Sequence, residues 1–205
     1  MSRKILVAFY STYGHNFARA KAVSQGVEAA GAIPILRRIQ ETLPIEVLAK
    51  MHAVEAQKAF ADVQVLTTPE LSECDGVVIC TGSRFGGIPA QVATFLDSTG
   101  QHWYKGSMTG KVGSAVCTTG SQHGGLEQTF QVLHTYFLHM GMVVVGLPIG
   151  QVPNAGTVTE VHGLTPYGAG SITGGQGERM PSALELEAAR LQGKHVATIA
   201  GKLSA

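Results

Sequence analysis

The fold is decided by a seven-residue motif that occurs twice in nearly the same form, as Thr81-Gly82-Ser83-Arg84-Phe85-Gly86-Gly87 and as Thr119-Gly120-Ser121-Gln122-His123-Gly124-Gly125. Each copy follows an apolar run, and a third polar loop, Ser11 to Asn16, follows the apolar run Ile5 to Tyr10. Loops that leave the carboxyl ends of parallel strands gather at one edge of the sheet, where open α/β folds bind ligands. The three loops therefore predict a site for a large, flat, polar ligand.

The rest of the chain alternates between two kinds of apolar spacing. Continuous apolar runs, typical of strands buried on both faces of a parallel sheet, are found at Lys4 to Tyr10, Ile33 to Ile39, Gly76 to Thr81, Val112 to Thr118 and Val143 to Ile149. Helical spacing lies between and after them, at Asn16 to Ala30, Ile45 to Phe60, Pro89 to Ser98, Leu126 to His139 and Ser182 to Leu203. This alternation predicts a doubly wound α/β sandwich of three layers.

One long segment, 151–181, does not fit that plan. It holds seven glycines and shows almost no helical or strand spacing. A stretch of this length without regular structure is usually functional or disordered. Its apolar residues, among them Leu164 and Tyr167, favour an ordered segment that packs at the ligand-binding edge or on a neighbouring subunit. We therefore expect residues 1–205 to form a single domain with a glycine-rich insertion before the last helix, which a capping box of Ser182 and Glu185 begins.

The composition of the chain limits the kinds of partner that the protein is expected to bind. Charged residues make up 14% of the chain and the formal net charge is +1, with no basic stripe that would neutralise the phosphates of a nucleic acid. No apolar run approaches the roughly 18 residues that a membrane-spanning helix needs. The cysteines Cys74, Cys80 and Cys117 are odd in number and lie in or beside apolar runs, which favours reduced core thiols and a cytoplasmic protein. Few charges on the surface also favour self-association.

Several kinds of active site are absent from the sequence. The stretch Gly106 to Lys111 is one residue short of a P-loop, and no G-x-G-x-x-G follows the first strand. No G-x-S-x-G and no H-x-x-x-H occurs, and no metal site is expected. The first loop carries no Lys or Arg between Ser11 and Ala18. Any phosphate bound there would therefore be held by neutral donors at the start of a helix. The chemistry is then expected to belong to a bound cofactor.

Five stretches carry a resemblance to a known family. They are Ser11-Thr12-Tyr13-Gly14-His15, Ser83-Arg84-Phe85-Gly86, Thr94 to Gly100, His139-Met140-Gly141-Met142 and Thr165-Pro166-Tyr167-Gly168-Ala169. With these motifs the chain resembles the WrbA family of flavodoxin-like NAD(P)H:quinone oxidoreductases from Lys4 to Leu203. The resemblance implies a five-stranded sheet of order 2-1-3-4-5, one non-covalent FMN per subunit, NADH or NADPH as reductant, a quinone substrate, and a homotetramer built as a dimer of dimers.

The resemblance also implies roles for individual residues. The cofactor-binding positions are Ser11, Thr12, Tyr13, Gly14, His15 and Asn16 at the FMN phosphate, Ser83, Arg84, Phe85 and Gly86 along the ribityl chain and ring, and Thr118, Thr119, Gly120, Ser121, Gln122 and His123 at the other edge of the flavin. His139 is expected to contact the flavin of a neighbouring subunit and is a candidate catalytic residue. Tyr13 is expected to border the nicotinamide, and Trp103 the quinone. Gln122, His123 and Met140 depart from the family pattern.

Alternatives remain at this point. Tyr13, Trp103 and the histidines could simply pack, and glycine loops could serve only as tight turns. A flavodoxin that carries single electrons would share the fold, although such proteins are usually strongly acidic and this chain has a pI of about 7.8. A module that binds partners without any cofactor is the third possibility. The favoured function is two-electron reduction of quinones by ping-pong hydride transfer through FMN.

Overall fold

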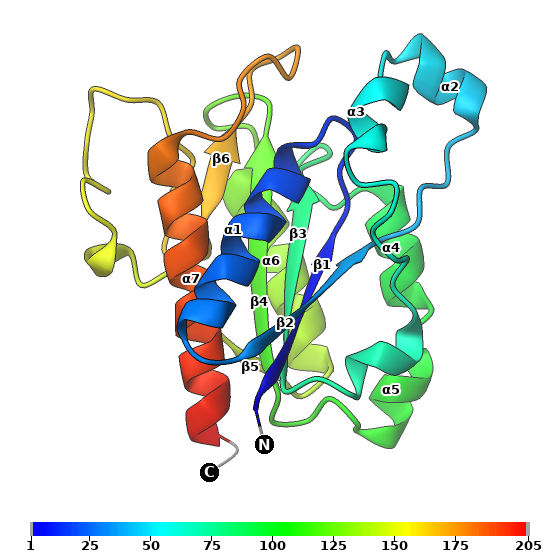
Figure 1. The fold of residues 1–205 in the computed structure, drawn as a ribbon, viewed down its shortest axis with the longest axis vertical. Coiled ribbons are helices and arrows are strands. Elements are labelled where there is room, and N and C mark those ends of the chain that lie inside the picture. The colour runs from blue at the N-terminus through cyan, green and yellow to red at the C-terminus, as the bar shows by residue number, and fades with distance from the viewer. Residues whose placement is uncertain (1, 204–205) are drawn as a thin grey trace.

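Continuous apolar runs place a parallel sheet at the centre of the molecule (Figure 1). The computed structural model describes residues 2–203. Its strands are β1 (Lys4–Phe9), β2 (Ile33–Arg38), β3 (Gly76–Gly82), β4 (Val112–Thr119), β5 (Val143–Val144) and β6 (Gly170–Ile172). The strand order is β2-β1-β3-β4-β5, with β6 paired to β4, and every pairing is parallel. The predicted order 2-1-3-4-5 is therefore confirmed.

Helices cover both faces of the sheet, and each face has its own apolar core. On one face lie α1 (His15–Ala29) and α7 (Ala183–Leu203), and on the other α4 (Ala90–Asp97), α5 (Gly100–Lys105) and α6 (Leu126–His139) (Figure 1). The α1 and α7 helices cross closely because glycine stands at the contact: a Cβ on Gly26 would lie 1.9 Å from the carbonyl oxygen of Arg190. The three-layer sandwich is confirmed.

Two predicted elements differ from the structure, and one helix was not predicted. The helix predicted over Ile45 to Phe60 is two short helices, α2 (Ile45–Lys50) and α3 (Val54–Lys58), because His52 adopts the left-handed region with φ 54° and interrupts the helical ladder. The α5 helix was not predicted. The fifth strand ends at Val144 rather than Ile149, and beyond it Leu147 donates its N–H to the carbonyl oxygen of Pro166 instead of to a strand.

The late segment contains a strand, contrary to the expectation of no regular structure. Gly170 to Ile172 form β6, in register with Cys117 to Thr119 of β4. This strand occupies the place beside the carboxyl half of β4 that the short β5 leaves open. The capping box at the start of α7 forms as predicted, with the Ser182 N–H donating to the Glu185 carboxylate at 2.9 Å. Among residues 2–203 no helix is both long and apolar enough to cross a membrane.

Candidate functional site

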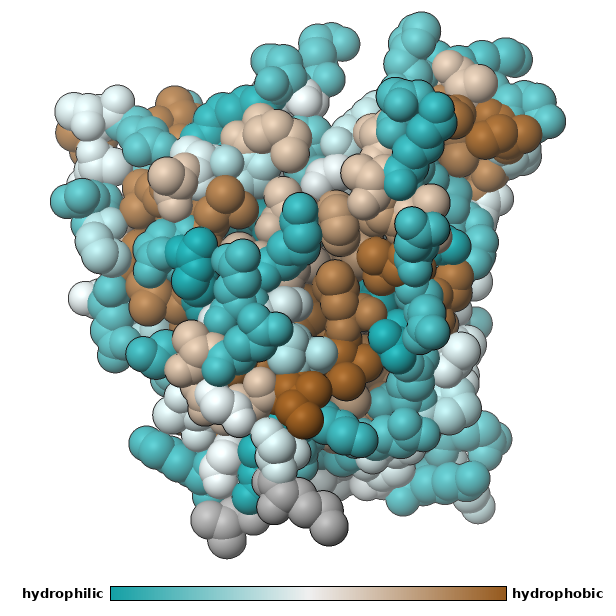
Figure 2. All heavy atoms as spheres, in the orientation of Figure 1, coloured by the Kyte–Doolittle hydropathy of each residue, from teal (hydrophilic) through white to brown (hydrophobic). Residues whose placement is uncertain are grey.

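The polar loops do gather at one edge of the sheet. A cleft of about 270 Å³ opens at the carboxyl ends of β1, β3 and β4. Its lining consists of residues 10–13, 15–16, 82–84, 89, 118–120 and 173–177. Figure 2 shows a notch in the same end of the molecule, between the tip of the late segment on one side and the α2–α3 region on the other. The three predicted loops thus share one site, and a fourth segment joins them.

The first loop is folded into a turn by its own hydroxyl. The Oγ of Ser11 accepts the N–H groups of Gly14, at 2.9 Å, and Asn16, at 3.3 Å. Gly14 has φ 90°, a conformation that favours glycine, and α1 begins directly after it. The first turn of α1 therefore presents N–H groups without helical partners, at the positive end of the helix dipole. The loop and the helix start therefore form an anion-binding site that is built from neutral donors.

Asn16 fixes the floor of the cleft. Its Nδ2 donates to the carbonyl oxygen of Tyr10 at 3.0 Å, whereas its buried Oδ1 has no partner in the described chain. A Cβ placed on Gly82 would lie 3.5 Å from both the Thr118 Oγ1 and an Arg84 guanidinium nitrogen. Gly82 therefore keeps open the space between these polar groups. An unmet buried acceptor in such a space is expected to meet a donor on a ligand.

The second loop supplies the only Lys or Arg among the lining residues. The Arg84 guanidinium donates to its neighbour's carbonyl at Ser83 and reaches the Thr12 Oγ1 at 3.5 Å, which brings the first and second loops together. The Ser83 N–H donates to the carbonyl oxygen of Thr118 at 2.7 Å, which joins the second loop to the end of β4. Most of the donor set is therefore neutral, with one cation at its edge.

Part of each copy of the repeated seven-residue motif lies outside the cleft. Phe85 has φ 52° and a fully exposed side chain, so it does not line the cleft of its own chain, and neither does Gly86. Ser121, Gln122 and His123 are exposed and also absent from the lining. The repeated glycines meet each other instead: a Cβ on Gly125 would lie 2.7 Å from the Gly86 Cα. Glycine is required there for contact between the two loops.

The late segment closes one side of the cleft. His15 bonds through Nε2 to the carbonyl oxygen of Gly177 at 3.0 Å, and burial lowers the pKa of this imidazole below its usual value. A neutral His15 therefore ties the start of α1 to the loop of residues 173–177. The sequence carried a signal for this contribution in the run Gly174-Gly175-Gln176-Gly177, but glycine alone does not indicate where a loop packs.

Three fully buried polar side chains, Arg19, Glu185 and Gln192, hold that segment in place. The sequence indicated Glu185 only as part of a capping box and gave no signal for the other two. Glu185 accepts the N–H of Ile172 at 3.1 Å and the Arg179 guanidinium at 2.8 Å. Gln192 accepts the Ala169 N–H at 2.5 Å. Arg19 donates to the carbonyl oxygens of Cys117 and Ala169, on β4 and just before β6. Helices α1 and α7 thus satisfy backbone groups of β6, of the residue before it and of β4, at the side of β6 where no further strand of residues 2–203 pairs with it.

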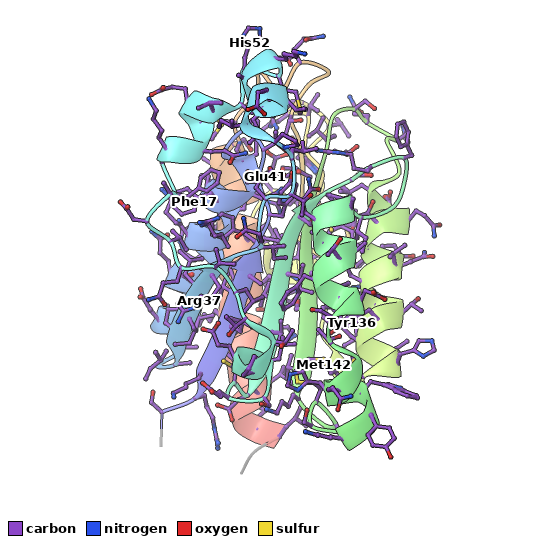
Figure 3. All side chains as sticks on the ribbon, turned by 90° about the vertical axis from the view of Figure 1, so that its right-hand side faces the viewer. Phe17, Arg37, Glu41, His52, Tyr136 and Met142 are labelled. Carbon is purple, nitrogen blue, oxygen red and sulfur yellow. The ribbon has the colours of Figure 1, made fainter. Side chains whose placement is uncertain are left out.

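The helical side of the cleft is held by different contacts. The Tyr13 hydroxyl donates to the carbonyl oxygen of Met51, at the break between α2 and α3. Tyr10 donates to Glu41 at 3.0 Å, and burial together with this carboxylate raises the pKa of Tyr10 to about 12. Burial alone would raise the pKa of Glu41, but hydrogen bonds from Leu43, Tyr10, Gln91 and Thr42 outweigh it and lower that pKa. Figure 3 shows Glu41 below His52, which marks the tip of this region.

Two predicted residues lie at the other end of the molecule. His139 is the last residue of α6, a helix of 14 residues that begins beside the cleft. At 1.5 Å per residue this places His139 roughly 20 Å away from that beginning. Trp103 lies on α5 and its side chain is 60% exposed. Neither residue lines the cleft of its own chain, so a role for either at a flavin requires a second copy of the chain.

The cleft fits a flat cofactor with a phosphate better than it fits protein-based catalysis. Its loops offer backbone N–H groups, hydroxyls and one guanidinium, with the unmet Asn16 Oδ1 on its floor. Residues 2–203 contain no cluster of side chains that could hold a metal ion. Cys74, Cys80 and Cys117 are buried free thiols, and burial raises the pKa of Cys80 to about 12, so none is an activated nucleophile.

The sequence is similar to that of known proteins. The model of a family described as NADPH-dependent FMN reductase matches residues 5–157. Proteins named NAD(P)H dehydrogenase (quinone) from Geobacter metallireducens and Geotalea uraniireducens are each 50% identical to this chain, with 98% of this chain and 98% or 99% of the relative covered.

Solved structures support the fold. A flavodoxin, WrbA-like protein from Agrobacterium tumefaciens superposes with a TM-score of 0.66 at 22% identity, covering 98% of this chain and 99% of that one. A flavodoxin from the domain Archaea gives a TM-score of 0.62 at 17% identity, covering 97% and 99%. The flavodoxin-like architecture and the resemblance noted in the sequence are confirmed, and the chain belongs to the NADPH-dependent FMN reductase family.

Proposed function

We propose that this protein is an FMN-dependent NAD(P)H:quinone oxidoreductase. The observation that carries the proposal is the cleft at the carboxyl edge of the sheet, in which loops from three strands present neutral donors around an open floor. The relatives that are 50% identical over nearly the whole chain bear the name NAD(P)H dehydrogenase (quinone). The enzyme is proposed to act as a single flavodoxin-like domain in the cytoplasm, with its glycine-rich insertion beside the site.

The first loop is proposed to hold the FMN phosphate. Ser11 accepts two backbone N–H groups, which leaves its own hydroxyl proton to donate, and the start of α1 adds N–H groups and a favourable dipole. Seating the phosphate on neutral donors leaves the guanidinium of Arg84 to face the ring end of the ligand. Ser83 and the residues Thr118 to Gly120 would line the remainder of the cofactor.

FMN, when bound, would supply the capacity to accept a hydride from the reduced nicotinamide and to pass it to a quinone. The chain's own residues bind the cofactor and the substrates, orient them, and exclude water from the site. Tyr13 stands at the rim with its ring half exposed and its hydroxyl fixed on Met51, so it can border a ring that enters the cleft. No acid or base of the cleft is poised to move a proton, because His15 is held by Gly177 and Tyr10 by Glu41.

A tetramer, arranged as a dimer of dimers, would complete the site. His139 and Trp103 are exposed at the far end of the chain, where the tyrosine at 104 and Leu138 are exposed as well. Exposed aromatic and aliphatic side chains that gather on one end suit an interface between subunits. Assembly would then bring His139 and Trp103 of one copy to the cleft of another.

An absorption spectrum tests the function directly. The purified chain is incubated with FMN and then treated with NADH or NADPH and finally with benzoquinone. We expect a bound flavin that bleaches with the reductant and recovers with the quinone, without accumulation of a one-electron-reduced state. A protein that stays colourless would support a cofactor-free module, and a long-lived one-electron state would support an electron carrier.

Kinetics and sedimentation test the finer points. If the reduced nicotinamide and the quinone bind in turn at the same place beside the flavin, double-reciprocal plots should give parallel lines. Converging lines would contradict this shared binding place. Sedimentation with FMN is expected to give a tetramer whose population grows with FMN occupancy, because a ligand at an interface stabilises that interface by mass action. A monomer at every concentration would remove His139 and Trp103 from the proposed site.

A further inference from the structure

A second hollow lies beside the cleft, at the carboxyl end of β2. It measures about 240 Å³ and is lined by Arg38, Val54, Gln57, Lys58, Phe60 and Ala61. We call it the β2 groove. A smaller hollow shares Tyr10 and Ser11 with the cleft, and Arg38, Gln57 and Phe60 with the β2 groove. The three hollows therefore follow one another along the carboxyl edge of the sheet, from the cleft to its outer strand.

Arg38 is held in position but most of its donors are unused. It is the last residue of β2, and its Nε donates to the carbonyl oxygen of Val63 at 2.8 Å. Its backbone is fixed as well, since its N–H donates to Gln64 and its carbonyl accepts from Leu66. A guanidinium has five N–H groups, and within residues 2–203 the two terminal nitrogens of Arg38 have no partner. They form a pre-positioned fork for an anion.

The neighbouring arginine provides a contrast. Arg37 donates from Nε to the Glu70 carboxylate at 2.6 Å and from Nη1 to the carbonyl oxygen of Leu36. Its charge is compensated, and Figure 3 shows it well below Glu41 and His52, towards the other end of the molecule. Of two consecutive arginines, one is structural and the other is available to a ligand.

The remaining groove residues add a second cation and an apolar floor. Lys58 pairs with Glu55, but both side chains are largely exposed, so this ion pair is weak and readily exchanged. Phe60 is buried beneath the groove against Phe9 and Phe17. Gln57 donates its amide to Glu41 at 3.2 Å and keeps its carbonyl oxygen free to accept. Two cations beside an apolar floor and an amide acceptor suit a phosphate monoester carried next to a flat amino-bearing ring.

We propose that the β2 groove binds the 2′-phosphoadenosine end of NADPH, so that Arg38 and Lys58 make the enzyme prefer NADPH to NADH. This inference rests on the proposed function, in which a reduced nicotinamide dinucleotide enters the adjacent cleft. Arginine recognises phosphate through bidentate hydrogen bonds, and the 2′-phosphate is the one group that NADPH has and NADH lacks.

Steady-state kinetics of the FMN-loaded full chain test the preference. The variants are Arg38→Gln, which shortens the donor, and Lys58→Ala, with Lys50→Ala as a control that removes an exposed charge from α2 outside the groove. We expect the KM for NADPH to rise about tenfold in Arg38→Gln and about threefold in Lys58→Ala, with the KM for NADH changed less than about twofold. An equal rise for both reductants, or no rise, would overturn the proposal.

Calorimetry gives a readout that does not depend on turnover. Adenosine 2′,5′-bisphosphate is expected to bind the wild-type chain more tightly than 5′-AMP, and Arg38→Gln should abolish the difference. If the two nucleotides bind equally while quinone reduction proceeds, the groove proposal fails and the function stands. If the difference persists but no quinone is reduced, the function fails and the groove stands.

Two further arms complete the test. Inorganic phosphate that binds as tightly as the bisphosphate would make the groove a general anion site and overturn the assignment to NADPH.

Thermal unfolding checks that each variant folds, because Arg38 also bonds to Val63. If Arg38→Gln does not fold, Lys58→Ala and the wild-type ratio of bisphosphate to 5′-AMP affinity decide the question, since Lys58 is exposed and holds no buried group.

Discussion

Two regions stand beside the cleft and are held there in different ways. The tip of the late segment, 173–177, continues from β6, and residues Ala169 to Ile172, in and just before this strand, are held by the buried side chains of Arg19, Glu185 and Gln192. The α2–α3 region buries few side chains, none of them within α3, and is tied to the first loop by Tyr13 and Met51. The glycine-rich side is therefore the fixed one, and the helical side is expected to move more easily. Composition alone would suggest the reverse.

The largest expected effect comes from removing the carboxylate under the fixed side. Glu185→Ala leaves the N–H groups of Gly163 and Ile172 without their acceptor and the Arg179 guanidinium without its buried partner. We expect the free energy of unfolding to fall by about 3–5 kcal/mol, as when one member of a buried ion pair is removed. Urea unfolding monitored by circular dichroism measures it.

A matched control lies in the same helix. Glu187 pairs with Arg190 on the surface, and Glu187→Ala is expected to cost at most about 0.5 kcal/mol. FMN affinity, measured by quenching of flavin fluorescence, should drop in Glu185→Ala and stay unchanged in Glu187→Ala. Equal costs for the two variants would contradict the view that buried polar groups hold this side of the cleft.

A smaller effect is expected at the amide that fixes the entry to β6. Gln192→Ala leaves the Ala169 N–H and the Ser114 hydroxyl without their Gln192 contacts. One buried polar group left unsatisfied costs about 1–3 kcal/mol. Hydrogen exchange should show faster exchange in β6 than in β3, whereas uniform acceleration across the sheet would mean that Gln192 supports the whole fold.

The fixed side is also expected to depend on pH through His15. Burial lowers the pKa of His15 in the folded chain, so the unfolded chain binds the proton more tightly. The contribution of His15 is therefore complete above about pH 6.5, the unperturbed value, and is lost as the pH falls below it. The free energy of unfolding should decline more steeply between pH 7.5 and about 5.5 in the wild type than in His15→Gln.

His134 and His195 also have pKa values lowered by burial, and they remain in both proteins. Their contributions cancel in the comparison, so the difference in slope reports His15. Identical slopes would show that His15 does not couple proton binding to the contact with Gly177.

The smallest effect on stability is expected on the helical side. Tyr13→Phe removes only the hydrogen bond to the Met51 carbonyl at a partly exposed position, which is worth about 0.5–1 kcal/mol. Hydrogen exchange in residues 45–58 should nevertheless accelerate, because few other contacts hold them. Tyr104→Phe, on the exposed surface of α5, is the control and should leave exchange in α2 and α3 unchanged.

The parts that sequence predicts well are those in which one residue pattern decides the outcome. Continuous apolar runs such as Ile5 to Phe9 specify buried strands, and hydroxyl and glycine loops after them specify a polar site at the strand ends. The order of the strands came from the family resemblance. These features depend on local composition and on topology rules that leave few choices.

The parts that sequence missed depend on contacts between distant residues. The strand at Gly170 has no alternating pattern, and its partners Glu185 and Gln192 look like ordinary polar residues of a helix. Phe85 stands in a cofactor-like motif, yet its left-handed backbone turns the ring to solvent. Its contact with a flavin stays a prediction for the assembled protein. The same holds for His139.

The pairing of β6 with β4 bears on the order in which the chain folds. Thr173 contacts Thr119 across 54 residues of sequence, whereas paired residues of β3 and β4, such as Gly76 and Val112, are 36 residues apart. Closing longer loops costs more entropy and slows folding. The central strands are therefore expected to assemble first, with the wall of the cleft docking afterwards. During synthesis the ability to retain a ligand would appear only once α7 has emerged to receive that wall.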